Sequence, residues 1–275
     1  MAGPTATGAG PRVASMTPTQ RFAELVGGPE DALPLDEAAM LIAAHAHPGL
    51  DVAGALGRLD ELAASVASPD LDALRHQLFV VEGFSGNQGD YYDPENSYLD
   101  SVLERRTGIP ITLSVVLIEV GRRVGVPLVG VGMPGHFLAA TLDEPRRFVD
   151  AFERGTVLDE DGCAARFAAV TGGRRLDPAA LTPVGPRAVL ARMLANLTAI
   201  ARRRRDQTLL GWVLQLRSAI PSQVPGERRE LAAALAAAGR FDEAAAVLES
   251  LADAHALEAG HQLRVQAASL RARLN

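Results

Sequence analysis

The spacing of apolar residues changes along the chain from a helical pattern to a strand pattern and back again. Between Arg21 and Phe79, apolar residues recur three and four positions apart, which predicts two or three amphipathic helices. Further along, the runs LVGVGM, HFLAATL and RFVDAF are short, rich in Val, Leu and Phe, and separated by turn residues. These runs predict antiparallel strands.

The segment PITLSVVLIEVGRRVG, residues 110–125, lies between these two patterns and is apolar on almost every side. Pro110 suits the first turn of a helix, where its missing N–H is not needed, and Gly125 before Pro127 marks the end. A helix that is apolar all round is buried. We therefore predict a central helix with the strands laid against it, in an α+β protein that is predominantly helical.

The segment before this helix is rich in glycine and contains all three tyrosines of the chain, between Tyr91 and Tyr98. Such a loop is either anchored by its rings or lines a groove, and we take Tyr91 and Tyr92 as candidate binding residues. Asn96 and Ser97 are polar candidates for the same surface. They are also predicted to cap a helix that runs through Arg105 and ends at Gly108.

The last third of the chain, from Pro178, is again helical in pattern. The unit LAAALAAAGRFDEAAAVLESL has small residues where paired helices touch, a glycine turn and an aromatic residue at the start of the second helix, and it resembles a tetratricopeptide repeat. We expect three parts: a flexible lead over residues 1–18, a first domain over residues 19–180 and a helical domain over residues 181–275.

Composition narrows the possible functions. Of the 275 residues, 48% are hydrophobic, and the formal charge is −6, which does not favour nucleic acid as a partner. All 27 basic residues of the Lys+Arg count are arginine, so lysine chemistry is excluded.

Arg202 to Arg205 point in four directions on a helix, and we interpret them as a solvated helix end. The single cysteine, Cys163, suits a reducing cytosol, and no apolar run is long enough to span a membrane.

The two histidines at the end of the first helical region do not have metal-ligand spacing. His45 and His47 are two residues apart, whereas a helical metal pair usually needs a spacing of four. We expect neither a metal nor an organic cofactor.

A cysteine nucleophile needs the N-terminus of a helix, a histidine to take its proton and a carboxylate to orient that histidine. The helix start at Gly108-Ile109-Pro110, the PGH turn at His136 and the strand residue Asp150 have the order of these three groups in transglutaminase-like proteins, which they resemble. In that register the position of the cysteine is occupied by Pro110. His136 would then open one strand, and Asp150 would lie on the next.

The sequence NSYLDSVLERRTGIPITLSVVLIEVGRRVGVPLVGVGMPGHFLA, followed by FVDAF, closely resembles the bacterial SirB-one family. That family combines a transglutaminase-like, papain-like core with tetratricopeptide-like helices, and the resemblance implies this fold for nearly the whole chain. Ala151 departs from the family, which usually has proline after the aspartate. The family has no established activity, so the resemblance implies a fold and not a reaction.

Three side chains remain as substitute nucleophiles. Ser114 lies one helical turn beyond Pro110, although a serine there more often bonds to its own helix backbone. Thr112 is close to the helix start, and Cys163 could form an arrangement with His136 and Asp150, although free cysteines are often simply buried. His136 and Asp150 are themselves structural remnants, parts of a binding cleft or residues that still take part in catalysis.

Two functional hypotheses follow. The first is a catalytically silent module that binds a protein or peptide through the cleft or the helical C-terminal part. The second is an acyl-transfer or hydrolase enzyme, with a displaced nucleophile acting with His136 and Asp150. Regulation through nucleic acid ranks last, because the sequence contains no basic face, zinc site or base-reading helix.

Overall fold

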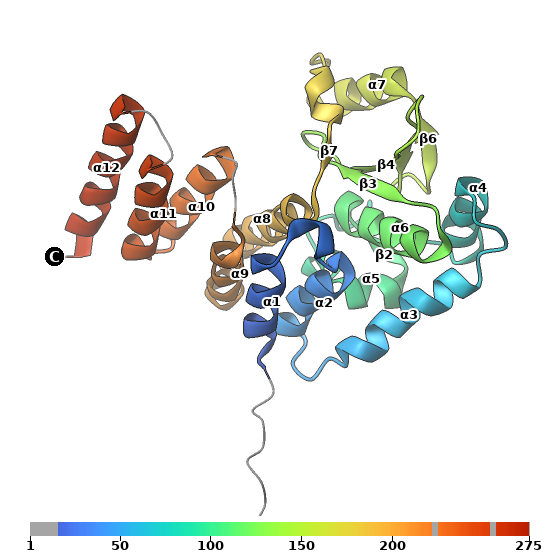
Figure 1. Ribbon diagram of the computed structural model, residues 1–275, viewed down its shortest axis with the longest axis horizontal. Coiled ribbons are helices and arrows are strands. Elements are labelled where there is room, and N and C mark those ends of the chain that lie inside the picture. Colours follow the sequence, from blue (N-terminus) through green and yellow to red (C-terminus); the bar gives the residue numbers. More distant parts are fainter. Residues whose placement is uncertain (1–15, 222–224, 254–256, 275) are drawn as a thin grey trace, which may run out of the picture.

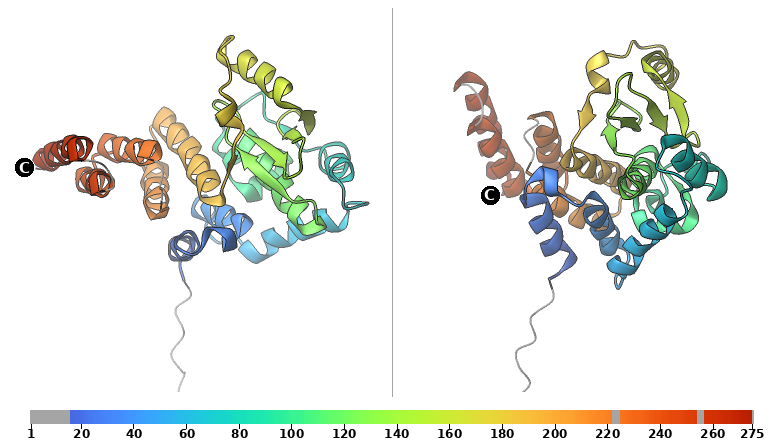
Figure 2. Two further views of the ribbon diagram at one scale, coloured as in Figure 1. Left: turned by 45° about the horizontal axis from the view of Figure 1, so that its top comes forward. Right: turned by 45° about the vertical axis from the view of Figure 1, so that its right-hand side comes forward.

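We analysed a computed structural model of the chain, which describes residues 16–221, 225–253 and 257–274 (Figure 1). An α+β body contains the sheet and the first helices, and the last helices extend away from it in a row (Figures 1 and 2). None of the helices in these ranges is long and apolar enough to cross a membrane. The expected flexible lead lies almost entirely outside the described residues.

The N-terminal region is helical as the apolar periodicity predicted, but it contains four helices and not the predicted two or three. Thr17 caps the first helix together with Gln20, and Asp51 caps the third through the backbone N–H of Gly54. The fourth helix continues into a π-helical turn, His76–Val81. The four helices are α1 (Pro18–Gly27), α2 (Leu35–Ala46), α3 (Val52–Ala64) and α4 (Leu71–Arg75).

The predicted central helix is α6 (Pro110–Val124), and it is buried along most of its length, from Pro110 to Gly121. Pro110 is at its first position, and Gly125 ends it in the left-handed conformation with φ 79°. Glycine adopts that conformation without steric cost. Both boundaries and the burial confirm the prediction.

The predicted strands form a five-stranded antiparallel sheet of order β6-β5-β4-β3-β7. Neighbouring residues of a strand face opposite layers: Ala139 and Val149 join the main core with α6, whereas Leu138 and Phe148 pack with α7 (Glu160–Thr171). The strands are β3 (Leu128–Val131), β4 (Leu138–Thr141), β5 (Phe148–Asp150), β6 (Thr156–Leu158) and β7 (Pro183–Val184).

The segment before α6 differs from the prediction. Residues Pro94–Ser97 form a 3-10 turn, and the next helix, α5 (Leu99–Arg105), starts after Tyr98 without a side-chain cap. Asn96 and Ser97 therefore do not cap it. Its end is also earlier than expected, because Arg106 is left-handed and residues 107–108 form β2 (Thr107–Gly108), which pairs in parallel with β1 (Ser85–Gly86).

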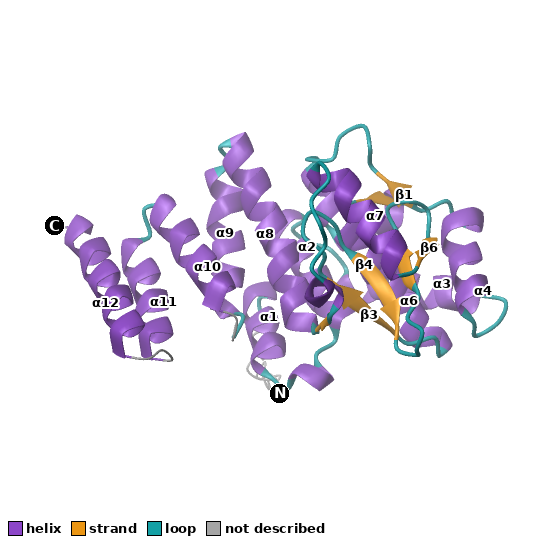
Figure 3. Cartoon of the chain, turned by 90° about the horizontal axis from the view of Figure 1, so that it is seen from above, coloured by secondary structure: helices purple, strands orange, loops and turns teal. Residues whose placement is uncertain are grey.

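In the described part of the chain after β7, five α-helices follow one another in a row when seen from above (Figure 3). Arg202 to Arg204 form the last turn of the first of them and are mostly exposed, as the interpretation of a solvated helix end expected. Arg203 lies over the Tyr92 ring, 4.5 Å from its centroid. The helices are α8 (Pro186–Arg204), α9 (Gln207–Ala219), α10 (Pro225–Ala237), α11 (Phe241–Asp253) and α12 (Leu257–Arg271).

A buried cluster of charges joins α6 to α2 and α3. Asp36 and Glu119 are 5% and 3% exposed. Arg123 bonds to Asp36 at 2.7 Å, to Glu119 at 3.2 Å and to the exposed Asp60 at 2.6 Å. Burial, followed by repulsion from Asp36, raises the pKa of Glu119. Arg123 thus compensates two carboxylates that water does not reach.

We expect Arg123→Met to lower the free energy of unfolding by about 3 kcal/mol, because it leaves buried carboxylates without their main partner. Urea unfolding at pH 7 measures this loss. The loss is expected to shrink as the pH falls, since the pKa of Glu119 is already raised and its protonation removes one of the buried charges. Arg122, whose side chain is 60% exposed, also contacts Asp36 and Glu119 and provides the matched control. Arg122→Gln should cost less than about 1 kcal/mol, and equal losses in the two variants would contradict this account.

Candidate functional site

His136 and Asp150 meet between two neighbouring strands. His136 lies in the turn that precedes β4 by two residues and so does not open the strand as predicted, whereas Asp150 is the last residue of β5. Their side chains are 7% and 0% exposed, and His136 Nε2 is 2.9 Å from Asp150 Oδ1. The pairing of Ala139 with Val149 in the two strands sets this proximity. His136 and Asp150, which the sequence analysis assigned to one site, are therefore in close contact.

A third residue, Arg166, also contacts Asp150. Arg166, on α7, places Nη2 3.1 Å from Asp150 Oδ2, and the backbone N–H of Glu153 donates to Asp150 Oδ1 at 3.2 Å. The contacts of Asp150 with His136 and Arg166 are within ion-pair distance but lack hydrogen-bond alignment. The buried carboxylate is therefore held mainly by charge. Sequence reasoning missed Arg166, because its position 16 residues past Asp150 carries no motif.

The turn that carries His136 is also fixed from the opposite side. Arg192, on α8, donates from Nη2 to the carbonyl oxygens of Met133 at 2.8 Å and His136 at 2.6 Å. Its guanidinium lies over the Phe137 ring, 5.4 Å from the centroid. Arg192 therefore sets the backbone position of His136, although it comes from the last third of the chain. No sequence signal identified it.

Phe152 covers His136. The two rings meet edge to face with centroids 6.2 Å apart, and Phe152 also packs against Tyr91 at 6.1 Å. A Cβ atom on Gly86 would lie 2.3 Å from the Phe152 ring, so only glycine allows this approach. Gly86 also donates its N–H to the Phe152 carbonyl at 3.1 Å. Phe152 thereby links the His136–Asp150 pair to β1.

The start of α6 approaches this region through β2. Gly86 pairs with Gly108, two residues before Pro110. Pro110 is buried at the first position of the helix, and its ring offers neither a nucleophilic atom nor an N–H. The predicted site of the lost nucleophile is thus a helix N-terminus that lies beside the segment packed on Phe152.

The two hydroxyl candidates on α6 are both inaccessible. Thr112 is 0% exposed; its Oγ1 donates to the Asn96 carbonyl at 2.7 Å and accepts from the Ile109 N–H at 3.2 Å. Ser114 is also 0% exposed, and its Oγ has no hydrogen-bond partner among the described residues. The expectation that Ser114 bonds to its own helix backbone is therefore wrong. Thr112 instead fastens α6 to the preceding loop.

Cys163 lies on α7, in the smaller hydrophobic cluster on the other side of the sheet from α6. It is 0% exposed. Burial and the nearby carboxylates of Asp159, Asp150 and Glu160 raise its pKa to about 12. At neutral pH the side chain is a thiol and not a nucleophilic thiolate, so the arrangement with His136 and Asp150 lacks an activated sulfur.

The tyrosine-containing loop lies against the same region. Tyr91 and Tyr92 are 40% and 46% exposed, and their rings meet edge to face at 5.4 Å. Asn96 is buried inside the loop, where its amide donates to the Asp90 carbonyl at 2.7 Å and accepts from Asn87 at 3.0 Å. Ser97 is buried too. Asn96 thus supports the loop from within, and of the four candidate binding residues Tyr91 and Tyr92 are the exposed ones.

The far end of this loop is fixed by His47, which follows α2. His47 Nδ1 is 2.6 Å from Asp100 Oδ2, and its Nε2 is 3.4 Å from Glu95 Oε2. His45 instead stacks on Trp212, with the ring centroids 5.3 Å apart. The two histidines therefore have different partners. Among the described residues, no group of His, Cys, Asp and Glu side chains could hold a metal ion.

His47 makes the stability of this anchor depend on pH. Burial lowers its pKa, but the two carboxylates outweigh burial, so the pKa is raised above 6.5. A histidine with a raised pKa in the folded state stabilises fully below its unfolded pKa, and this contribution is lost as the pH rises through the folded pKa. We expect the stability difference between the wild type and His47→Gln to be larger at pH 6 than at pH 8.5. Urea unfolding at both pH values measures it, and a difference that does not change with pH would contradict the assignment.

The sequence is similar to known proteins over much of its length. A UPF0162 protein of Xylella fastidiosa (strain Temecula1) is 38% identical over 187 residues, which cover 62% of this chain and 66% of that protein, just under two thirds of its length. A UPF0162 protein of Vibrio cholerae is 32% identical over 48% of this chain and 50% of its own. F-box only protein 21 of Mus musculus is 36% identical over 57% of this chain and 26% of its own. The pattern of the Transglutaminase-like superfamily matches residues 51–195, more than half of the chain, and the protein therefore belongs to that superfamily.

Proposed function

We propose that this protein is a catalytically silent transglutaminase-like module that binds a peptide or protein segment beside Phe152. The observation that carries the proposal is the residue at the start of α6. The resemblance to transglutaminase-like proteins places the nucleophile at Pro110, and a proline ring has no atom that can attack a carbonyl. The other candidates do not replace it, because Thr112, Ser114 and Cys163 are all buried.

The retained His136–Asp150 pair is compatible with silence. Asp150 is fully buried and needs positive partners whether or not a reaction takes place. Arg166 supplies a positive charge at 3.1 Å, and the His136 ring lies at 2.9 Å. The pair also favours the second candidate, an acyl-transfer or hydrolase enzyme with a displaced nucleophile, because it keeps a general base and its orienting carboxylate. The experiments below separate the two.

The surface beside Phe152 suits a polypeptide ligand. A hollow of about 280 Å³ is lined by residues of β1 and of the turn after β5, including Gly86, Phe152 and Arg154. Tyr91, which packs on Phe152, and its neighbour Tyr92 are both partly exposed. Exposed aromatic rings next to a hollow lined with polar groups are typical of surfaces that bind other proteins.

The distribution of the domain also supports a binding role. The matching region makes up only 26% of mouse F-box only protein 21, so a similar domain occurs inside a much larger protein of a different kind. We assign the chain to the SirB-one family within the superfamily, on the sequence resemblance of residues 96–152. We also expect it to act in the cytosol, because its one cysteine forms no disulfide.

The C-terminal helices are the second proposed docking surface. We propose residues 19–180 as the transglutaminase-like domain and residues 181–275 as a tetratricopeptide-like domain. Helices α10 and α11 bury small residues against each other, including Ala234 and Ala244, as paired repeat helices do. The family match extends to residue 195, and α8 holds the His136 turn through Arg192. Experiments should therefore use the full chain.

A peptide-display selection against the full chain tests binding at the cleft. We expect selected peptides to lose at least about tenfold in affinity for Phe152→Ala, because removing an aromatic anchor at the centre of an interface typically costs 2 kcal/mol or more. Val170→Ala, an exposed position on α7, is the control and should leave affinity unchanged. Turnover of an amide or ester substrate that disappears in His136→Ala would instead establish the enzymatic candidate.

Replacing Pro110 with cysteine tests the assignment of the lost nucleophile. A thiol at this helix N-terminus, paired with His136 as the resemblance implies, should have a pKa below the ordinary value of about 8.5. Thiolate absorbance during a pH titration measures this value without requiring reagent access. The background absorbance from the Cys163 thiolate is small near neutral pH, since the pKa of Cys163 is raised to about 12. The pKa should return toward the ordinary value in Pro110→Cys combined with His136→Ala, and no change between the two variants would place the nucleophile position elsewhere.

A further inference from the structure

Positive charge borders the aromatic surface beside Phe152. Tyr92 and Phe152 both pack against Tyr91, with their ring centroids 5.4 Å and 6.1 Å from it, so Tyr91 is the middle ring of three. Arg203, on α8, lies over the Tyr92 ring, 4.5 Å from its centroid. At the other end, Arg154 lines the same hollow as Phe152. The three rings therefore have an arginine at each end.

The side chains of both arginines are available to a ligand. Both residues are exposed, and in the part of the chain that the structure describes neither side chain has a hydrogen bond or a carboxylate within ion-pair distance. The contact of Arg203 with the Tyr92 ring involves no hydrogen bond, so its N–H groups can still donate to an oxyanion. Glu153, the acidic residue in the wall of the hollow, is paired with Arg166 at 3.2 Å.

The backbone at Arg154 is strained. Its φ is 53°, in the left-handed region that glycine prefers and other residues rarely adopt. The next residue, Gly155, has φ 72° and must be glycine, because a Cβ atom there would overlap the Phe79 ring. Arg154 itself is exposed, so packing does not require its side chain. Strained residues cluster where ligands are held, and the place of Arg154 at the hollow agrees with that tendency.

A third arginine adds positive charge near the middle ring. Burial raises the pKa of Tyr91, and the charge of Arg192 opposes this rise, so the two side chains are close enough to interact. Arg192 Nη2 is occupied by the carbonyl oxygens of Met133 and His136. Among the described residues, however, its guanidinium has no carboxylate within ion-pair distance. The field around Tyr91 is therefore favourable to a negative charge.

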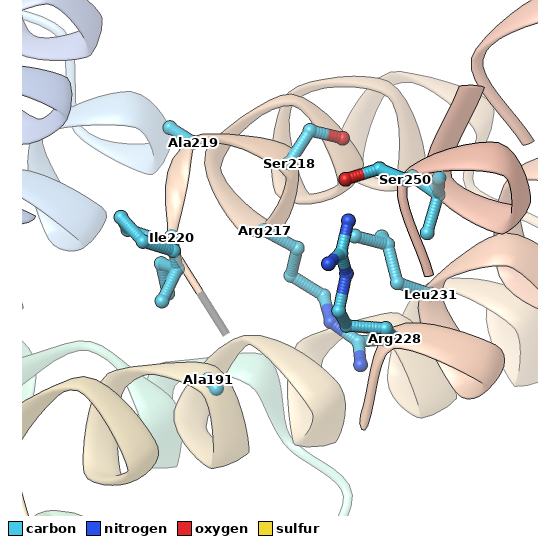
Figure 4. Close-up of a pocket in the computed structure, with 10 residues that line it drawn as sticks. Ala191, Arg217, Ser218, Ala219, Ile220, Arg228, Leu231 and Ser250 are labelled. Carbon is cyan, nitrogen blue, oxygen red and sulfur yellow. The ribbon is translucent and has the colours of Figure 1, made fainter. Parts of the chain in front are cut away.

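The cavity of about 370 Å³ among the C-terminal helices differs in this respect. Figure 4 shows Arg217 and Ser218 in its wall. Arg217 lies 3.6 Å from Glu230, and the Ser218 hydroxyl donates to the Leu214 carbonyl at 2.9 Å. These groups already have partners within the protein. The exposed arginines beside the three rings are therefore the stronger indication of an anionic ligand.

We infer that the segment bound beside Phe152 is acidic: an extended peptide with a carboxylate side chain on each side of a short uncharged stretch. The inference rests on the proposed function, because it gives the chemistry of the ligand for the same surface. Arg154 and Arg203 hold the two carboxylates, and the three rings contact the stretch between them. The ring spacings of 5.4 Å and 6.1 Å correspond to no more than about four residues of an extended chain, at about 3.3 Å per residue.

The charge of the peptides enriched by display on the full chain tests this inference. We expect acidic residues on both sides of the stretch that contacts the rings. A synthetic peptide in which asparagine and glutamine replace these acidic residues should bind about tenfold more weakly or worse, because charge-assisted hydrogen bonds are lost. Added salt should weaken the acidic peptide more than its amide copy.

Two outcomes of the selection separate this inference from the proposed function. Enriched peptides that lose affinity for Phe152→Ala but carry no excess of acidic residues overturn the inference and leave the proposed function standing. If no enriched peptide depends on Phe152, both are overturned.

Arginine variants locate the contacts. Arg154→Gln and Arg203→Gln should each weaken the acidic peptide by about threefold or more, and the double variant by about tenfold. The amide copy should bind to all of them alike. Neither side chain has an ion pair among the described residues, so the midpoint of thermal unfolding should stay at the wild-type value. Unchanged affinity of the double variant for the acidic peptide would place its carboxylates elsewhere and overturn the inference.

Two control variants exclude a general effect of net charge. Arg229→Gln removes the same charge from α10, where Arg229 is exposed and lines a groove of the C-terminal helices, and should leave affinity unchanged. Asp90→Asn removes an exposed negative charge next to Tyr91 and should keep or raise affinity. A loss in Arg229→Gln as large as in Arg154→Gln would reduce the effect to net charge and contradict the inference.

Discussion

The burial of α6 is the constraint on which the rest of the fold depends. A helix apolar on almost every side cannot lie at a surface, so other elements must cover each of its faces. The strands cover one side and the N-terminal helices another, and both contribute to one continuous core. The charges near the end of the helix are consequently buried too, and Arg123 compensates them through α2 and α3. The start of the helix, with Pro110, is enclosed by the same packing.

Under the proposed function, the candidate site retains parts of a catalytic arrangement without a nucleophile, and this enclosure accounts for that combination. Asp150 lies at the end of a strand that is buried on both faces, where an uncompensated carboxylate would be very costly. His136 and Arg166 are then useful as partners of a buried charge, independently of any reaction. A proline at the start of α6 leaves no buried charge uncompensated. It also removes no helix hydrogen bond, because the first N–H of a helix has no intrahelical partner. In the proposed arrangement, the nucleophile is thus the member of the set whose loss the fold tolerates most easily.

The sequence predicted those parts of the structure that depend on periodicity and on helix boundaries. The central helix from Pro110 to Gly125 and the three strands near His136 and Asp150 formed as expected, because local pattern and burial agree there. The edge strands β6 and β7 were missed, since three- and two-residue strands have too few positions to show alternation. Asn96 and Ser97 are residue types that often cap helices. The Asn96 side-chain amide instead donates to the Asp90 carbonyl inside the loop. The roles of Arg166, Phe152 and Arg192 could not be predicted, because they depend on contacts that only the folded structure shows.

The contact between Arg192 and the turn at His136 has a consequence for the order in which the protein is made. The two residues are 56 positions apart, and Arg187 on the same helix reaches the carbonyl of Val26, 161 positions back. A chain that leaves the ribosome from its N-terminus can therefore form α6 and the hairpin of β3 and β4 before α8 exists. Until α8 emerges, the carbonyl groups of the turn lack their guanidinium donor. The geometry around His136 is thus completed late in synthesis, by a segment that contributes no side chain to the His136–Asp150 pair itself.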